Sequence, residues 1–241
     1  MVMKESVVSG MEEGEGAGLL LPFTGSVASA EAFRLILSDL TLGALKPGQK
    51  LKVRELNERY GIGASPLREA LAQLAARGLV LLEDRKGFRV PPVSLEQLQD
   101  FSRSRQIVEG EALRLAIMHG DAAWEGEVLS VFHQLKREIE HRDTASQEWQ
   151  DNYELRHHRF HQTLIAACPL ASLIQFCDAL YIKMTRYRRL LKELGFPGET
   201  EGGEHARIVD AVLARDADAA VPLLHAHIGL TADAAARYLG E

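Results

Sequence analysis

Four histidines stand at spacings that could bring their imidazoles together around one metal ion. His157 and His161 are four residues apart, so on a helix they project from the same face, about one turn from each other. His205 and His227 lie in two later segments of the chain. Side chains from several helices can converge on a divalent metal inside a bundle. On spacing alone, surface histidines or hydrogen-bonded core histidines are the more common case, so the metal site and the ordinary histidines both stay open at this point.

A second group of residues has the chemistry to bind DNA phosphates. Residues 31–92 carry a net charge of +4, whereas residues 93–241 carry −7 and the whole chain carries −6. In the basic segment, Arg54 opens one expected helix, and Ser65 and Arg68 lie on the first turn of the next. Lys86 stands at the tip of an expected hairpin. Arg and Lys are normally exposed, so a small helical module with solvated charges is the alternative.

The elements of the basic segment follow from its apolar spacing. Phe33, Ile36, Leu37 and Leu40 fall at i, i+3, i+4 and i+7, which predicts an amphipathic helix. Further helices are expected over Arg54–Tyr60 and from Ser65-Pro66 to Gly78, and strands over Leu79–Glu83 and Phe88–Val90. This order is a winged helix-turn-helix, whose third helix enters the major groove of DNA.

Ser65 is expected to cap the third helix, because Ser is a preferred capping residue and proline suits the first helical position. The start of a helix also presents backbone N–H groups and the positive end of its dipole to a phosphate. We therefore expect the start of this helix, with Ser65 and Arg68, to lie against the DNA.

The rest of the chain predicts a flexible tail and a helical bundle. Residues 1–29 are acidic and rich in small residues, which favours a mobile tail. Pro91-Pro92 marks a boundary between a DNA-binding domain at 30–92 and a second domain at 94–241. The second domain shows six helical segments with short connections, so the expected fold is mainly α, with the winged domain followed by an antiparallel all-helical bundle. Only two cysteines are present, and no stretch is apolar and long enough for a bilayer span.

The basic segment closely resembles the GntR family of bacterial transcription regulators. The resemblance covers residues 30–92 and rests on Leu45-Lys46-Pro47-Gly48, Arg54-Glu55-Leu56, Ser65-Pro66-Leu67-Arg68-Glu69-Ala70-Leu71 and Gly87-Phe88-x-Val90. It implies DNA contacts from Arg54 and Arg68, from the start of the recognition helix, and from the wing around Lys86 and Gly87. The family usually has Arg two residues before the proline, where this chain has Ala64, and this departure bears on the operator sequence.

The second domain resembles the FadR-type C-terminal domain of GntR regulators, in its shorter, VanR-like form with six helices. The resemblance rests on Phe160-His161-x-x-Leu164, Glu204-His205-x-x-Ile208, Arg215-Asp216-Ala217 and His227-Ile228. It implies a divalent metal held by His161, His205 and His227. The family's fourth ligand is an Asp, and His157 stands in its place. Imidazole shifts the preference toward softer transition metals, so zinc is the expected ion, with nickel or another such metal as the alternative.

The same resemblance implies a small organic or sugar acid as effector, bound beside the metal. A carboxylate in a partly apolar cavity needs a cation, and Arg can pair with it in bidentate fashion. Arg105 is the first candidate and Arg186 the second, although Arg186 with its neighbours Arg188 and Arg189 also fits a solvated face. Glu109 is placed to pair with Arg105 at i, i+4 instead of serving the ligand.

The function expected is that of a ligand-responsive regulator, in particular a cytoplasmic repressor that binds a palindromic operator as a homodimer. One alternative is a metalloenzyme in which the metal activates water and Glu154 acts as the base. Against it, the winged domain has no catalytic purpose, and no nucleophile constellation or phosphate loop is present. The other alternative is a DNA-binding module whose bundle only dimerises.

Overall fold

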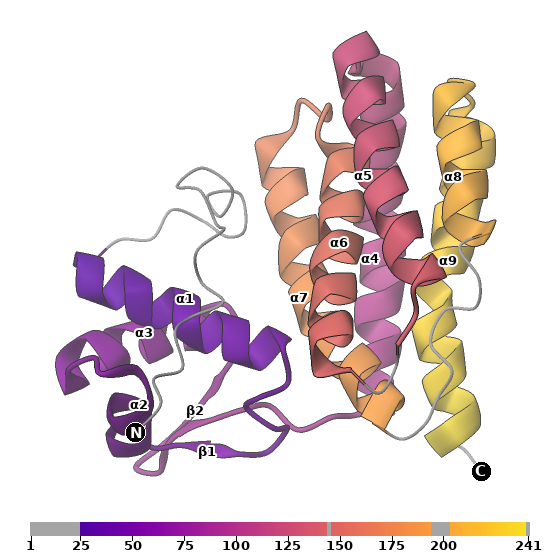
Figure 1. The fold of residues 1–241 in the computed structure, drawn as a ribbon. Helices are drawn as coiled ribbons and strands as arrows, with labels where there is room; N and C mark the ends of the chain where they lie inside the picture. Colours follow the sequence, from indigo (N-terminus) through magenta and orange to yellow (C-terminus); the bar gives the residue numbers. More distant parts are fainter. Residues whose placement is uncertain (1–24, 144–145, 194–202, 240–241) are drawn as a thin grey trace.

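Two separate hydrophobic cores organise the chain. The computed structural model describes residues 25–143, 146–193 and 203–239. The smaller core is built from residues between Ala32 and Val90 together with Ile182, and the larger core from residues between Leu98 and Ala235. Figure 1 shows the two units side by side, with the first in indigo and purple and the second from magenta to yellow.

The first unit is a winged helix-turn-helix, as predicted. Its elements are α1 (Val27–Thr41), β1 (Lys50–Leu51), α2 (Val53–Tyr60), α3 (Ala64–Ala76), β2 (Leu81–Glu83) and β3 (Gly87–Arg89). The apolar stripe of α3, with Leu67, Leu71 and Leu74, is fully buried, while the opposite face of the helix is left exposed. Because α1 begins at Val27, the last three residues of the expected tail are helical; residues 1–24 lie outside the described residues.

The start of α3 differs from the prediction. Gly63 is the capping residue, Ala64 is the first helical residue, and the cap makes no side-chain hydrogen bond, so Ser65 does not cap the helix. Gly at this position costs only a few tenths of a kcal/mol relative to Ser. Pro66 is tolerated at the third helical position because the N–H groups of the first turn have no intrahelical acceptor. The first turn of α3 therefore has uncapped N–H groups and contains no acidic residue.

The wing is a three-stranded sheet instead of the expected two-stranded hairpin. The strand order is β1-β3-β2, all antiparallel, with Leu51 opposite Phe88 and Leu82 opposite Phe88 on the other side. β1 was missed because two residues are too short for an alternating pattern. The turn between β2 and β3 has positive φ at Arg85 (+56°) and Gly87 (+86°), which holds Lys86 at its tip.

The second unit is the expected six-helix bundle over the described residues. Its helices are α4 (Leu95–His119), α5 (Ala122–Glu140), α6 (Gln147–Ile165), α7 (Ala171–Glu193), α8 (Gly203–Leu213) and α9 (Ala217–Leu239). The side chains of Ser94 and Asp216 cap α4 and α9, as their sequence positions predict. The sequence Gly195-Phe196-Pro197-Gly198 predicts a helix end, and these residues lie outside the described residues. α4 runs through the centre, packed against α9, α7 and α6.

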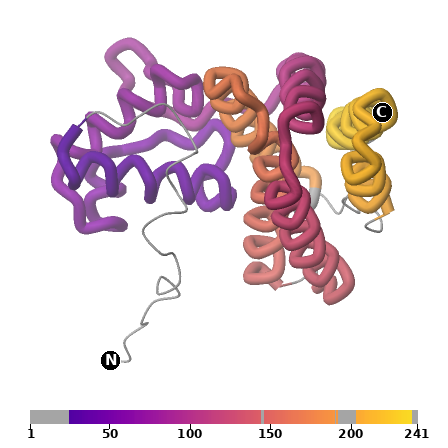
Figure 2. Tube along the Cα trace, turned by 90° about the horizontal axis from the view of Figure 1, so that it is seen from above, coloured from indigo at the N-terminus to yellow at the C-terminus, as the bar shows by residue number. Residues whose placement is uncertain are grey.

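One helix of the bundle also contacts the first unit. α7 packs against α4 on one side and against α1 on the other, and Figure 2 shows it in orange between the two units. The ends of two helices of the first unit lie close to α7. Gly43, after α1, faces Arg189, and Gly78, after α3, faces Lys183; both glycines have positive φ. Within the part of the chain that the structure describes, no helix combines the length and apolar character needed to cross a membrane.

Candidate metal centre and nucleic-acid interface

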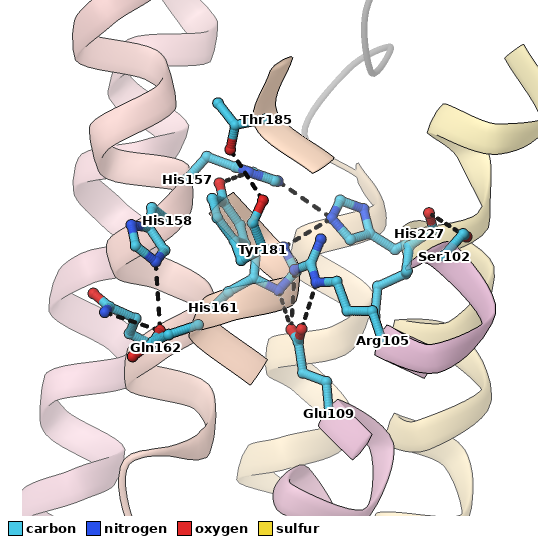
Figure 3. A network of polar contacts seen from close by, with 12 residues as sticks. Ser102, Arg105, Glu109, His157, His158, His161, Gln162, Tyr181, Thr185 and His227 are labelled. Carbon is cyan, nitrogen blue, oxygen red and sulfur yellow. Dashed lines mark hydrogen bonds and ion pairs between the residues drawn. The ribbon is translucent and has the colours of Figure 1, made fainter. Parts of the chain in front are cut away.

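Three of the four predicted histidines converge inside the bundle. His157 and His161 come from α6 and His227 from α9, and one ring nitrogen of each lies within 4.8 Å of the others. Nε2 of His227 is 3.3 Å from Nε2 of His157 and 3.2 Å from Nε2 of His161. All three side chains are buried. Figure 3 shows the rings pointing into one space between α4, α6, α7 and α9.

The other ring nitrogen of each histidine faces an oxygen. Nδ1 of His161 is 2.5 Å from Oε1 of Glu109, and Nδ1 of His157 is 2.6 Å from the Tyr181 hydroxyl. Nδ1 of His227 is 3.5 Å from Oε2 of Glu204. In metal sites such partners hold the imidazole hydrogen on the outer nitrogen and turn the lone pair of the inner nitrogen toward the ion. The arrangement here is of that kind, with Nε2 as the inner nitrogen.

The spacing of the inner nitrogens fits a transition-metal ion. With Zn–N bonds of about 2.0–2.1 Å, two nitrogens of a tetrahedral site lie about 3.3 Å apart, close to the 3.2 and 3.3 Å between the Nε2 atoms. Three lone pairs turned toward each other also repel unless a cation or a hydrogen lies between them. The residues present therefore fit the metal that this kind of bundle implies.

His205 lies beside these three histidines, but its ring nitrogens are not part of their cluster. Its ring centroid is 4.5 Å from that of His227 and 5.3 Å from that of His157, and it also packs on Phe160. The side chain is 1% exposed, so it lines the same interior. The structure thus brings all four predicted histidines to one place and gives three of them a common focus.

The imidazole of His161 is neutral at physiological pH. Burial, followed by the charge of Arg105 and the neighbouring histidines, holds its pKa well below the usual value of 6.5. A neutral imidazole is the form that ligates a metal. On α7, burial raises the pKa of the Cys177 thiol, which keeps this neighbouring thiol protonated and poorly suited to compete as a ligand.

Two arginines with carboxylate partners lie beside the histidines. Arg105 is 2% exposed and donates from Nε and Nη2 to Glu109 at 2.6 and 3.2 Å. Arg188 donates to Glu154 at 3.0 Å. Both guanidinium groups lie about equally close to the Tyr181 ring, at 4.6 and 4.5 Å from its centroid. The predicted i, i+4 pair between Arg105 and Glu109 is therefore formed, and Glu109 binds His161 as well.

The solvated-face interpretation of two arginines on α7 was wrong. Arg188 and Arg189 were expected on a solvated face, yet they are 7% and 5% exposed, because α7 is covered by the bundle on one side and by the winged unit on the other. The imidazole of His158 is also buried. It is 9% exposed and stacks on Tyr181 at 4.2 Å, next to Asp178, so it lies behind the Tyr181 hydroxyl that contacts His157.

Arg186 contacts a different part of the molecule. Its guanidinium lies over the rings of Phe101 and Tyr187, and it lines a cleft between the two units. None of these contacts involves a clustered histidine, so the two arginines proposed for the effector lie in different surroundings.

Sequence reasoning missed the contribution of α7 to the site. Asp178, Tyr181, Thr185 and Arg188 are spaced at i, i+3, i+7 and i+10, and all are buried. Polar residues in that spacing form one stripe on a helix. A polar stripe on a helix that must be buried on most sides is the sequence feature that points to these residues.

The residues predicted to contact DNA are all exposed. Arg54, at the start of α2, has a side chain 83% exposed, and Ser65, Arg68, Lys86 and Gly87 are also exposed. Ser65 and Arg68 lie on the first turns of α3, where the uncapped N–H groups are. A recognition helix in this position has the donors and the positive dipole end that a phosphate requires.

A winged helix-turn-helix joined to a helical bundle with a histidine cluster defines a class of DNA-binding regulators, and comparison with known families agrees. Residues 28–90 match the family model described as "Bacterial regulatory proteins, gntR family", and residues 100–230 match the FCD domain. The chain belongs to the GntR family and carries the FadR-type C-terminal domain, so it is a transcription regulator and not a metalloenzyme.

Curated relatives are regulators of the same kind. The chain is 36% identical to the HTH-type transcriptional regulator BphR of Paraburkholderia xenovorans, over 81% of this chain and 80% of that protein. It is 34% identical to the HTH-type transcriptional repressor GlaR of Escherichia coli, over 84% of this chain and 93% of that protein. The solved structure of McbR/YncC from E. coli has the same fold, with a TM-score of 0.76 at 22% identity over 89% of this chain and all of that one.

Proposed function

We propose that this protein is a ligand-responsive repressor, controlled by a small carboxylate that binds next to a divalent metal in the bundle. The observation that carries the proposal is the meeting of the Nε2 atoms of His157, His161 and His227 beside the Arg105 guanidinium. A metal and an arginine side by side form a binding site for a carboxylate, because each attracts one of its oxygens.

The metal is assigned to His161, His205 and His227, with His157 in the place of the usual Asp. With four neutral imidazoles, zinc is the ion that the ligands favour, with nickel as the alternative. When bound, it would supply a positive centre that attracts a ligand oxygen. Glu109 and Tyr181 hold two of the imidazoles in place through their outer nitrogens, and removing such partners weakens metal affinity by about 10–100-fold.

Arg105 is the residue that orients the effector. Glu109 uses its Nε and Nη2 donors, which leaves Nη1 for an acceptor. An arginine clamped by a carboxylate is fixed in direction before the ligand arrives, so less conformational freedom is lost on binding. Glu109 thus serves both the metal ligand His161 and the anion-binding arginine.

The DNA-binding domain is assigned to residues 30–92 and the effector domain to 94–241. Arg54, Ser65, Arg68, Lys86 and Gly87 contact the operator, with α3 in the major groove and the wing on the flanking backbone. One winged domain covers one half-site, so a palindromic operator requires a homodimer, whose two-fold axis matches that of the DNA. Such a protein works in the bacterial cytoplasm, where the chromosome lies.

The test is a two-stage titration. A thermal-shift screen of organic and sugar acids on zinc-loaded protein identifies ligands, since a ligand that binds only the folded state raises its stability. Operator affinity is then measured with and without the ligand found, and light scattering gives the mass of the protein. We expect a dimer whose operator affinity changes by about 5–150-fold with the ligand. A monomer contradicts the proposed homodimer. A dimer whose operator affinity no acid changes contradicts control by a ligand and leaves the bundle as a dimerisation domain.

A further inference from the structure

We propose that a second anion-binding site lies in the cleft between the winged domain and α7, with Arg186 as its principal ligand. The site takes a small organic anion, with a carboxylate or phosphate head and an apolar body. It is separate from the metal centre, and it goes beyond the effector site described above.

The cleft has a wall from each unit. The winged domain contributes the segment after α1, including Leu45 and Pro47, and the bundle contributes Ile182, Lys183 and Arg186 of α7. The enclosed space is small, about 30 Å³, and the cleft opens to solvent on one side, so the head of an anion would lie inside and its body at the mouth. A molecule bound here therefore touches both units at once.

All the charged side chains that line the cleft are positive. Lys46, Lys183, Arg186 and Arg189 line the cleft together with apolar residues, and no Asp or Glu is among the lining residues. A concave surface with one sign of charge and apolar walls concentrates ions of the opposite sign. The cleft is thus suited to an anion that also has apolar surface.

Two of these cations have partners that account for their positions. Arg189 donates from Nη2 to Asp151 at 2.6 Å. Lys183 and Arg189 also face the ends of α3 and α1, next to Gly78 and Gly43. A helix end carries the negative side of its dipole, so both side chains contribute to docking of the winged domain.

Arg186 contacts neither a carboxylate nor a helix end among the described residues. Its described contacts are the rings of Phe101 and Tyr187 and a 3.4 Å hydrogen bond to the Tyr187 hydroxyl, and it forms no ion pair with a described residue. Its Nε atom is buried without a hydrogen-bond partner among the described residues. A buried donor on a charged group without an acceptor is costly, and an anion in the cleft provides the acceptor.

The pKa of Lys183 also indicates an excess of positive charge in the cleft. Burial and the charge of Arg186 lower the pKa of its ammonium group, with only Asp100 acting in the opposite direction. An anion beside Arg186 relieves this repulsion, because it lies close to both cations. The guanidinium fork pairs with either a carboxylate or a phosphate, and the apolar walls favour a ligand with a ring or a short chain.

The experiment uses full-length protein that has been stripped of metal and dialysed free of chelator. Sodium benzoate and inorganic phosphate are titrated separately at constant ionic strength, against chloride, and melting is followed. We expect a saturable rise in Tm of about 2–4 °C, which is what 1 kcal/mol gives for a protein of this size. A stronger response to benzoate than to phosphate identifies a carboxylate with an apolar body, and the reverse identifies a phosphate.

Two variants decide the location. Arg186→Gln removes the charge from a partly exposed position, and we expect it to fold and to lose the response. Arg114→Gln, on α4 and paired with Asp218, removes an equal charge elsewhere and keeps the response. The proposal is overturned if neither anion gives a saturable shift, or if Arg186→Gln responds like the wild type.

Discussion

Tyr181 and Ile182 are consecutive residues of α7 that belong to different parts of the molecule. The Tyr181 hydroxyl is 2.6 Å from Nδ1 of His157, in the histidine cluster. Ile182 is 5% exposed and belongs to the hydrophobic core of the winged unit. The same turn of α7 therefore contacts both the histidine cluster and the core of the DNA-binding domain. Such a contact gives the two sites a short physical connection.

We predict that Ile182→Ala weakens this connection. The change leaves a cavity between α7 and the winged unit, and we expect the free energy of unfolding to fall by about 2–5 kcal/mol, as for other buried Ile→Ala changes. The ratio of operator affinities with and without the acid found by thermal shift should move toward one. Urea denaturation and operator titration measure the two effects. Ile182→Val, which removes one methyl group, is the control and should keep most of the response to the acid; an unchanged response in the alanine variant contradicts the connection.

A neighbouring pair of histidines tests the metal site. His157→Ala removes a nitrogen from the focus formed with His161 and His227. Loss of a residue that only hydrogen-bonds a metal ligand lowers metal affinity by about 10–100-fold, and we expect a larger loss of zinc affinity here. His158→Ala alters the next residue, which stacks on Tyr181 from outside the focus, and should change zinc affinity by less than tenfold. Competition with a chromophoric zinc chelator gives both values. Equal losses in the two variants would show that the effect is structural.

The sequence predicted the fold well and the surroundings of the site poorly. The winged unit, the six helices and the caps at Ser94 and Asp216 follow from local apolar spacing and capping chemistry, which act over a few residues. The meeting of His157 with His227 depends on how α6 and α9 pack, which no local pattern records. Likewise, nothing near Arg188 in the sequence shows that α7 is covered on both sides.

The capping error at α3 has a different cause. Ser65-Pro66 has the composition of a helix start, but Gly63 can adopt the extended conformation of a cap with little loss, so the helix begins earlier. The sequence preference for Ser over Gly is too small to decide between two positions that are two residues apart. The functional conclusion is unaffected, since Ser65 still lies on the first turn.

The low pKa of His161 predicts a pH-dependent stability of the metal-free protein. Its folded pKa lies below the unfolded value of 6.5, so below about pH 6.5 the unfolded chain binds one more proton, and stability falls as the pH falls. The slope approaches about 1.4 kcal/mol per pH unit for one proton. Urea denaturation at pH 7.5 and 5.5 measures it. His161→Gln keeps a donor for Glu109 and removes the titration, so it should lose less stability over this range; an identical loss in both proteins contradicts the assignment.

Operator binding should depend on Arg68 more than on other exposed arginines. Arg68→Ala removes an exposed side chain on the early part of α3, and we expect a loss of about 1–3 kcal/mol if it reads a base. If it contacts a phosphate, the salt dependence of binding should instead fall by about one unit in slope. Arg34→Ala is the control, because Arg34 lies on α1 and pairs with Glu31. Operator titrations over a salt series separate the two cases, and unchanged affinity and slope remove Arg68 from the interface.

The last prediction concerns the residue that holds the effector. Arg105→Ala leaves Glu109 buried without its partner, which costs about 3–5 kcal/mol when a buried pair is broken, so loss of response in that variant is ambiguous. Arg105→Lys keeps the positive charge next to Glu109 but replaces the planar fork by a single ammonium group. We expect this variant to fold and bind zinc, and to lose at least tenfold in affinity for the acid found by thermal shift.

Arg188→Lys is the matched control for this change. Arg188 is also buried, also pairs with a carboxylate and lies at nearly the same distance from the Tyr181 ring as Arg105. Because its carboxylate partner is Glu154 and not the Glu109 that binds His161, we expect its substitution to change effector affinity less. Calorimetry on the two zinc-loaded variants gives the affinities, and operator titration shows whether the ligand still acts. If Arg188→Lys loses more affinity than Arg105→Lys, the effector carboxylate lies on the α7 side of the histidines and Arg188 is its ligand.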